Sequence, residues 1–141
     1  MSTPLYTREI LGLAVALADY PLFPDSGFHS EQISRTCGSR VSVDIDVRGG
    51  TIARFGVRAQ ACAIGQASAA LLAQNAVGKC PADVRHTYRA LREWLDGQAP
   101  PPEWLGLNVL EPVLAHPGRH EALLLPWKAA DAALSMSGAG S

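Results

Sequence analysis

The feature that most constrains the fold is a pair of alternating segments that double back at a Gly-Gly pair, residues 49–50. In residues 41–47 apolar side chains alternate with serine and aspartates, as in a strand with one buried and one solvated face. Residues 53–59 alternate in a similar way, and a short Gly-Gly connection between two such runs is typical of an antiparallel hairpin. A hairpin brings its outer ends together, so Cys37 and Cys62, which flank it, are predicted to share a site.

Cys62 precedes an alanine-rich segment, residues 64–76, which we expect to form a helix that lies close on the sheet. At a helix N-terminus, unpaired backbone N–H groups and the helix dipole favour the thiolate, which is the form that binds metals and acts as a nucleophile. Free cysteine is also among the most buried residue types. Simple packing is therefore the alternative interpretation of both Cys37 and Cys62.

The remaining elements follow from apolar periodicity and from the positions of proline and glycine. We expect a helix within the apolar run of residues 5–18, with Thr7 as the cap at its start, a strand over 31–36, a helix over 81–97, a short helical or irregular segment over 104–114 and a helix over 119–134. Residues 135–141 are small and are predicted to be disordered. The pattern predicts one α+β domain over residues 1–141, with helices packed on one face of a three-stranded antiparallel sheet.

The charge balance argues against several classes of partner. The chain has 141 residues and a net charge of −1, from 12 basic and 13 acidic side chains, which gives no general attraction to nucleic acid or to anionic lipid. A signal peptide is the alternative for the apolar N-terminal run, but Glu9 interrupts its edge and the run is short of the roughly 20 residues that span a bilayer. Three cysteines without a disulfide framework indicate a cytoplasmic thiol or metal protein.

No common catalytic motif is present in the sequence. We find neither CxxC nor HExxH nor a Ser/His/Asp signature, so we expect a protein that is not an enzyme. The third cysteine, Cys80, also lies at a predicted helix start, but it is remote from the other two along the chain. We therefore expect no metal role for Cys80.

Several segments around the first two cysteines resemble one known family. These segments are Cys37-Gly38, residues 43–47, residues 50–53, residues 61–69, Gly78-Lys79 and Leu125-Pro126-Trp127. They resemble the iron–sulfur cluster assembly scaffolds of the IscU, SufU and NifU N-terminal type. The resemblance covers most of the chain and implies that an iron–sulfur cluster or zinc is held by three cysteines and an aspartate. Two of those cysteines correspond to Cys37 and Cys62.

The sequence departs from that family at the other ligand positions. Ser39 stands where the family has its aspartate, and a hydroxyl is a poor metal ligand. Ala122 stands where the family has its third cysteine. His120 and Glu121 just before it are the candidate substitutes, since imidazole and carboxylate both bind zinc and iron. The family's chaperone-recognition segment, a Leu-Pro-Pro-Val-Lys run, is also absent, and residues 115–119 replace it.

Three functions therefore remain open on the sequence. The first is a scaffold-like carrier that holds iron and sulfide, persulfide or zinc through Cys37 and Cys62, with a cysteine desulfurase and cluster-acceptor proteins as partners. The second is a degenerate homologue that serves as an interaction module without a cluster. The third is a sulfur-transfer partner that accepts persulfide on Cys62. Because two cysteines make an incomplete ligand set, His120, Glu121, a small thiol or a second subunit of a homodimer would have to complete it.

Overall fold

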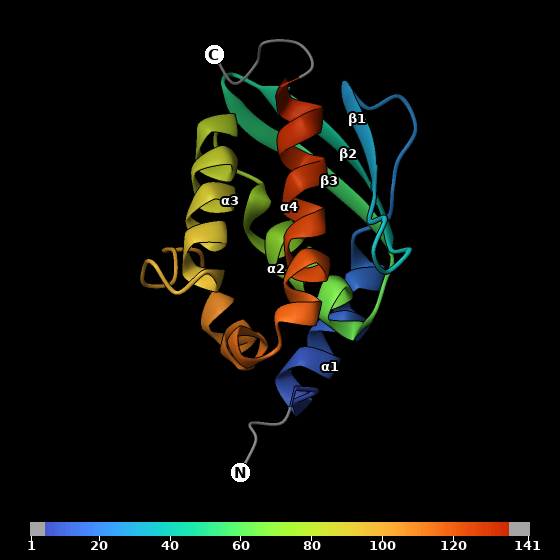
Figure 1. Cartoon of the computed structure of the whole chain (residues 1–141). Coiled ribbons are helices and arrows are strands. Elements are labelled where there is room, and N and C mark those ends of the chain that lie inside the picture. The colour runs from blue at the N-terminus through green and yellow to red at the C-terminus, as the bar shows by residue number, and fades with distance from the viewer. Residues whose placement is uncertain (1–4, 136–141) are drawn as a thin grey trace.

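The computed structural model describes residues 5–135 and has the predicted α+β architecture (Figure 1). The described part of the chain forms one antiparallel sheet in the order β1-β2-β3, and its strands are β1 Phe28–Ile33, β2 Arg40–Arg48 and β3 Thr51–Gln60. The helical elements are α1 Arg8–Ala16, η1 Leu17–Asp19, α2 Ala63–Ala76, α3 Pro81–Leu95, η2 Leu107–Ala115, η3 Pro117–Arg119 and α4 His120–Ser135. Helices α2 and α4 lie on the sheet, α1 packs on α2, and α3 packs on α4.

The central hairpin is confirmed. Gly49 and Gly50 have φ values of 60° and 83°, the pair of positive values that a type I′ turn requires. The register of β2 and β3 runs from the Arg48–Thr51 pair at this turn to the Arg40–Gln60 pair at the open end. Cys37 precedes β2 and Cys62 follows β3, so both cysteines lie at the open end of the hairpin, as the alternation predicts.

The prediction for the first strand was wrong in its position. We expected residues 31–36, whereas β1 spans Phe28–Ile33 and residues 34–39 form a tight loop. β1 is polar and its one strong aliphatic residue, Ile33, is half exposed, so its own pattern is weak. Its position is set by pairing with β2, where His29 lies opposite Asp44 and Glu31 lies opposite Ser42.

The first residues of β3 also differ from the prediction. A register irregularity at Asp46/Val47 leaves Ala53 without a partner on β2. Such a bulge shifts the alternation of one strand by a residue. As a result Ile52, and not Ala53, is buried at the start of β3, while Phe55 and Val57 are buried as expected.

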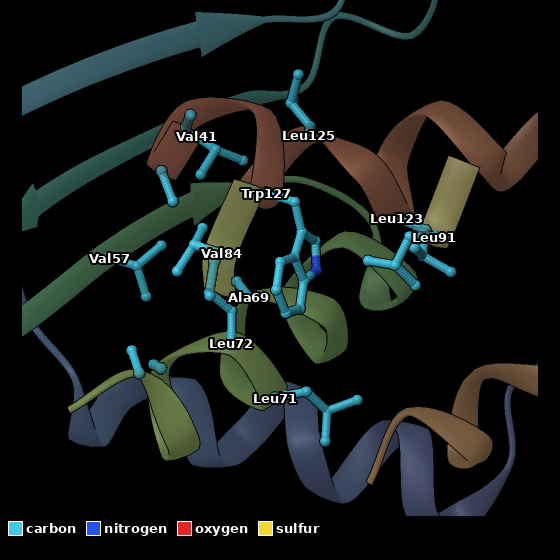
Figure 2. Packing of buried hydrophobic residues seen from close by; sticks show 14 of the residues in the cluster. Val41, Val57, Ala69, Leu71, Leu72, Val84, Leu91, Leu123, Leu125 and Trp127 are labelled. Carbon is cyan, nitrogen blue, oxygen red and sulfur yellow. The ribbon is translucent and has the colours of Figure 1, made fainter. Parts of the chain in front are cut away.

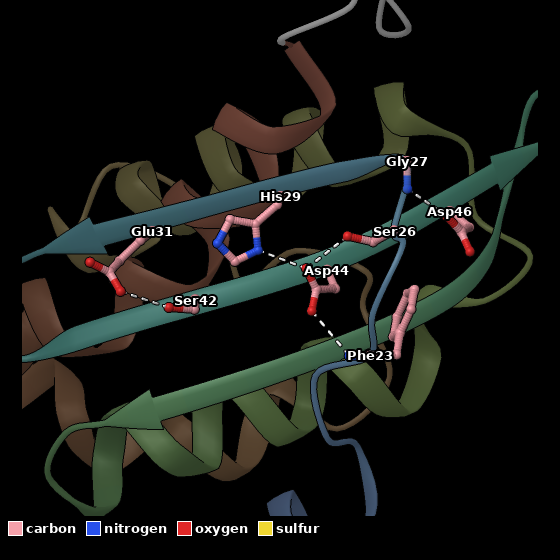
Figure 3. A network of polar contacts seen from close by, with 8 residues as sticks. All are labelled: Phe23, Ser26, Gly27, His29, Glu31, Ser42, Asp44 and Asp46. Atoms are coloured by element: carbon pink, nitrogen blue, oxygen red, sulfur yellow. Dashed lines mark hydrogen bonds and ion pairs between the residues drawn. The ribbon is translucent and has the colours of Figure 1, made fainter.

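The polar face of β2 is not solvated as predicted, because the segment of residues 22–27 crosses it (Figure 3). Asp44 is only 6% exposed, and its carboxylate accepts hydrogen bonds from the Phe23 N–H (3.0 Å), the Ser26 hydroxyl (2.8 Å) and His29 Nδ1 (2.7 Å). Burial opposes ionisation of Asp44, but these hydrogen bonds outweigh it and hold the pKa of Asp44 below its ordinary value. Asp44 thus fixes the chain that links η1 to β1.

The core lies between the sheet and helices α2 and α4, and Trp127 of α4 is fully buried in it (Figure 2). The Trp127 indole N–H donates to the Ser68 hydroxyl (3.0 Å), and Ser68 donates in turn to the Leu123 carbonyl (2.6 Å). The ring of Trp127 meets Trp104 edge to face, with centroids 4.8 Å apart. This hydrogen-bonded chain ties the middle of α2 to α4.

The helices mostly follow the predicted ranges. Thr7 caps α1 by accepting from the Ile10 N–H (3.1 Å), and α3 starts directly after Cys80. Ser135, which we assigned to a disordered tail, is the last residue of α4, and residues 136–141 lie outside the described residues. No helix among residues 5–135 combines the length and apolarity needed to cross a bilayer.

Gly56 generates a first prediction. A Cβ at Gly56 would lie 2.2 Å from the Pro21 carbonyl oxygen, because the chain crosses β3 there and Tyr20 accepts the Val57 N–H at 2.8 Å. We expect Gly56→Ala to lower the free energy of unfolding by about 1–3 kcal/mol in urea titration. Gly12→Ala, in the exposed part of α1 with open space around it, should instead raise it by about 0.5–1 kcal/mol. Equal stability of Gly56→Ala and wild type would contradict the crossing.

Ser68 generates a second prediction. Ser68→Ala leaves the buried Trp127 indole N–H and the Leu123 carbonyl without the hydroxyl that joins them. We expect a loss of about 1–3 kcal/mol in the free energy of unfolding. Ser135→Ala is the control: its hydroxyl contacts Arg85 and the Asp131 carbonyl, but these contacts are exposed to water, so stability should change by less than about 0.5 kcal/mol. A Ser68→Ala protein as stable as this control would show that the hydrogen-bonded chain contributes nothing.

Candidate functional site

Three parts of the chain meet at the open end of the hairpin (Figure 1). They are the loop of residues 34–39, the start of α2 and the start of α4. Glu121 of α4 accepts hydrogen bonds from the loop, and a Cβ on Gly65 of α2 would lie 3.3 Å from the Ala122 carbonyl oxygen of α4. Cys37 belongs to this loop and Cys62 is the N-cap of α2, so the structure places both cysteines at the same end of the sheet.

The loop that carries Cys37 is organised around Ser34, which is 1% exposed. The backbone N–H of Ser34 donates to the Ser39 carbonyl (2.8 Å), and its carbonyl accepts from the Gly38 N–H (2.9 Å). Its side-chain oxygen accepts from the Cys37 N–H at 3.3 Å. Gly38 has a φ of 72°, the left-handed conformation that glycine adopts at least cost. The result is a compact turn with Cys37 exposed near its tip.

Two hydroxyl groups surround the Cys37 sulfur. Its Sγ lies 3.2 Å from Ser34 Oγ and 3.1 Å from Ser39 Oγ. Hydrogen bonds with Ser34 and then with Ser39 lower the pKa of Cys37, and they outweigh the opposing effects of burial and of the Glu121 charge. Because the Ser34 hydroxyl donates its proton to Glu121, Ser39 is the hydroxyl that can donate to the sulfur. Cys37 is therefore an accessible thiol whose thiolate is favoured, which is the form that attacks sulfur or binds a soft metal.

Cys62 has different surroundings. It is half-buried, packs against the core and precedes the first turn of α2, where its carbonyl accepts from the Gln66 N–H (3.0 Å). Cys80 lies at the start of α3, and its N–H donates to the Asp83 carboxylate (3.1 Å). The neighbouring Lys79 carbonyl accepts from the Ile52 N–H (2.7 Å), near the closed end of the hairpin. Cys80 is thus not brought together with the other two cysteines.

His120 and Glu121, the two candidate substitute ligands, make hydrogen bonds with different parts of the chain. Nε2 of His120 lies 3.0 Å from the Val113 carbonyl oxygen of η2. The Glu121 carboxylate accepts from the hydroxyls of Ser34 and Thr36, and these hydrogen bonds lower its pKa. Within residues 5–135, no three His, Cys, Asp or Glu side chains are arranged to hold a metal ion. The described conformation therefore offers two thiols but no complete protein ligand set.

Sequence reasoning missed Ser34 and Thr36. Ser34 stands three residues before Cys37, a spacing at which a serine hydroxyl commonly accepts a backbone N–H in a turn, so a local signal for its role was present. Thr36 meets Glu121, which lies 85 residues away along the chain. No local pattern could indicate that contact.

The environment of Cys37 generates a third prediction. Because its pKa is lowered, we expect Cys37 to be half-alkylated by iodoacetamide at a lower pH than an ordinary free thiol, as followed by peptide mass spectrometry. Ser39→Ala removes one hydroxyl from the sulfur and should move the midpoint to higher pH. Ser42→Ala, whose hydroxyl contacts Glu31 instead, should leave the midpoint unchanged. An unchanged midpoint in Ser39→Ala would contradict this account of the thiol.

Comparison with known proteins identifies solved structures that have the same architecture. No family model and no curated protein sequence matches the chain. Among solved structures, the N-terminal part of a nitrogen-fixing NifU-like protein from Brucella abortus is 28% identical, with a TM-score of 0.87 and 92% of each chain covered. A putative iron–sulfur cluster assembly scaffold for the SUF system from Fervidobacterium islandicum is 22% identical, with a TM-score of 0.84 and coverage of 93% of this chain and 97% of that one. These neighbours confirm the resemblance predicted from the sequence: the chain has the fold of NifU N-terminal and SufU-type proteins.

Proposed function

We propose that this protein is a scaffold-like carrier in iron–sulfur cluster assembly, which holds iron with sulfide or persulfide through Cys37 and Cys62 and passes it to acceptor proteins. The observation that carries the proposal is the placement of both thiols at one end of the sheet, with Cys37 exposed. One fold neighbour is described as a putative iron–sulfur cluster assembly scaffold and another as NifU-like, which supports a carrier role.

The donor set supports a transient cargo. A stable tetrahedral site uses four protein donors, whereas Cys37 and Cys62 provide two soft donors at this end of the sheet. Iron with sulfide suits such a site, because inorganic sulfide itself supplies part of the coordination of a cluster. A structural zinc ion would need further protein ligands, and no group of three among residues 5–135 provides them. The remaining positions would be filled by a small thiol or by a second copy of the chain.

The environment of Cys37 favours a second candidate function, the acceptance of sulfur from a persulfide. The Cys37 thiolate would attack the outer sulfur of a donor persulfide, a new S–S bond would form on Cys37, and the donor thiolate would leave. No external oxidant or reductant is needed, since one S–S bond replaces another. We assign this role to Cys37 and not to Cys62, because Cys37 is exposed and hydroxyls favour its thiolate.

Both candidate functions imply the same kinds of partner. The donor is a cysteine desulfurase, which supplies the persulfide, and the recipients are cluster-acceptor proteins. An accessible thiolate would survive in the cytoplasm, where thiols are kept reduced. The chaperone-recognition run of the family is missing from residues 115–119, so we expect transfer to proceed without that chaperone.

Anaerobic reconstitution tests the proposal and is our fourth prediction. With iron and sulfide we expect the wild type to gain charge-transfer absorbance and bound iron. Cys37→Ala and Cys62→Ala should each weaken binding at least about tenfold, since even an outer-shell partner of a metal ligand contributes that much. Cys80→Ala and His120→Ala should behave as wild type, because Cys80 lies near the closed end of the hairpin and the His120 imidazole contacts the Val113 carbonyl.

A persulfide assay separates the alternatives. The protein is incubated with a cysteine desulfurase and cysteine, and the added sulfur is located by peptide mass spectrometry. Sulfur transfer to Cys37 without retention of iron would favour the sulfur-acceptor function over the scaffold function. If the wild type retains neither iron and sulfide nor persulfide, both proposals are wrong and the interaction module is the remaining function.

A further inference from the structure

Glu121 makes the contact that joins α4 to the loop of Cys37. Its two carboxylate oxygens accept hydrogen bonds from different hydroxyls, Oε1 from Ser34 and Oε2 from Thr36. Hydrogen bonds to an ionised carboxylate are stronger than those between neutral groups. Because the two hydroxyls lie two residues apart, one side chain of α4 fixes the backbone on the N-terminal side of Cys37.

The arrangement argues against Glu121 as a ligand in this conformation. Each oxygen already faces a hydroxyl donor, so metal binding by Glu121 would have to displace Ser34 or Thr36. The contact with the thiol runs through Ser34, whose oxygen lies 3.2 Å from the Cys37 sulfur. Glu121 therefore contacts Cys37 only indirectly, through the hydroxyl of Ser34.

The helix that carries Glu121 is itself fixed to the helix that Cys62 caps. Ser68 of α2 donates to the Leu123 carbonyl of α4 at 2.6 Å, two residues beyond Glu121. Near the start of α2, the missing Cβ of Gly65 lets the Ala122 carbonyl of α4 approach. A connected path thus leads from the Cys37 loop through Glu121 and α4 to the first turns of α2.

We infer that Glu121 is a positioning residue: it clamps the loop of residues 34–39 to α4 so that the thiols of Cys37 and Cys62 can bind one common partner atom. This inference rests on the proposed function, because it concerns how the two thiols are held for their cargo. It assigns Glu121 a role through Ser34 and Thr36 in place of direct coordination. Loss of the clamp frees the Cys37 loop, while Cys37 itself stays accessible.

The test, our fifth prediction, uses phenylarsine oxide as a probe of paired thiols. Arsenic forms two As–S bonds, and its oxygen leaves as water with the two thiol protons, so tight binding requires two thiols that reach one atom. The variants are Glu121→Ala, Glu121→Gln, Thr36→Val and, as a matched control, Glu111→Ala, which removes an exposed carboxylate from η2. Circular dichroism confirms that each variant is folded, and alkylation with iodoacetamide reports the reactivity of Cys37 alone.

We expect the wild type to form a one-to-one adduct that is lost in Cys37→Ala and in Cys62→Ala. Glu121→Ala should weaken the adduct by about tenfold or more, because it removes two hydrogen bonds to a charged group. Glu121→Gln should remain close to wild type, since its amide can accept from Ser34 and donate to Thr36. Thr36→Val should lose less than Glu121→Ala, and Glu111→Ala should lose nothing.

The outcomes separate this inference from the proposed function. If the wild type forms the adduct and Glu121→Ala forms it equally well, the clamp is refuted and the shared thiol site stands. If Glu121→Gln loses as much as Glu121→Ala while Thr36→Val behaves as wild type, the carboxylate acts directly and the positioning role is refuted. If the wild type forms no adduct through both cysteines, the shared site and the proposed function fail together.

Discussion

The geometry of the site depends on how the first turns of α4, which contain Pro126, are held on α2. Proline has no backbone N–H, so the helical hydrogen bond to the Ala122 carbonyl cannot form. In the same turn, the Leu123 carbonyl accepts from Ser68 of α2. Ser68 thus binds the carbonyl next to the one that Pro126 leaves without its helical hydrogen bond. Gly65 completes the fit, since a Cβ there would meet both Ala61 and the Ala122 carbonyl. The first turn of α4 is held on α2 at the end of the sheet where the cysteines lie.

Buried polar contacts also fix other elements on both faces of the sheet. On the helix side, Trp127 and Ser68 lock α4 to α2 inside the core. On the opposite face, the buried Asp44 gathers donors from the Phe23 N–H and from Ser26 and His29. An unpaired carboxylate at this depth would be costly, and three hydrogen bonds compensate for its burial. The network joins elements that are separate in sequence, so it fixes the path of the chain between η1 and β1.

The parts of the fold that could be predicted are those that local sequence patterns specify. The hairpin follows from alternation and a Gly-Gly turn, and the starts of α1 and α3 follow from Thr7 and Pro81. β1 could not be placed, because its polar sequence has no period of its own and its register is imposed by β2. The approach of Cys37 and Cys62 was predictable from the hairpin. The Ser34–Glu121 contact joins residues 87 positions apart, so it required the structure.

The groups around Cys37 determine the chemistry of this end of the sheet. Ser39 stands where the resembling family has an aspartate, and it contacts the sulfur at 3.1 Å as a hydroxyl. A carboxylate there would add negative charge and a metal donor, whereas a hydroxyl adds a hydrogen-bond donor that favours thiolate. Glu121 supplies its charge one hydroxyl further away, where it orders the loop. In this chain the groups at Cys37 favour an accessible, hydrogen-bonded thiolate, which agrees with the transient cargo that we propose.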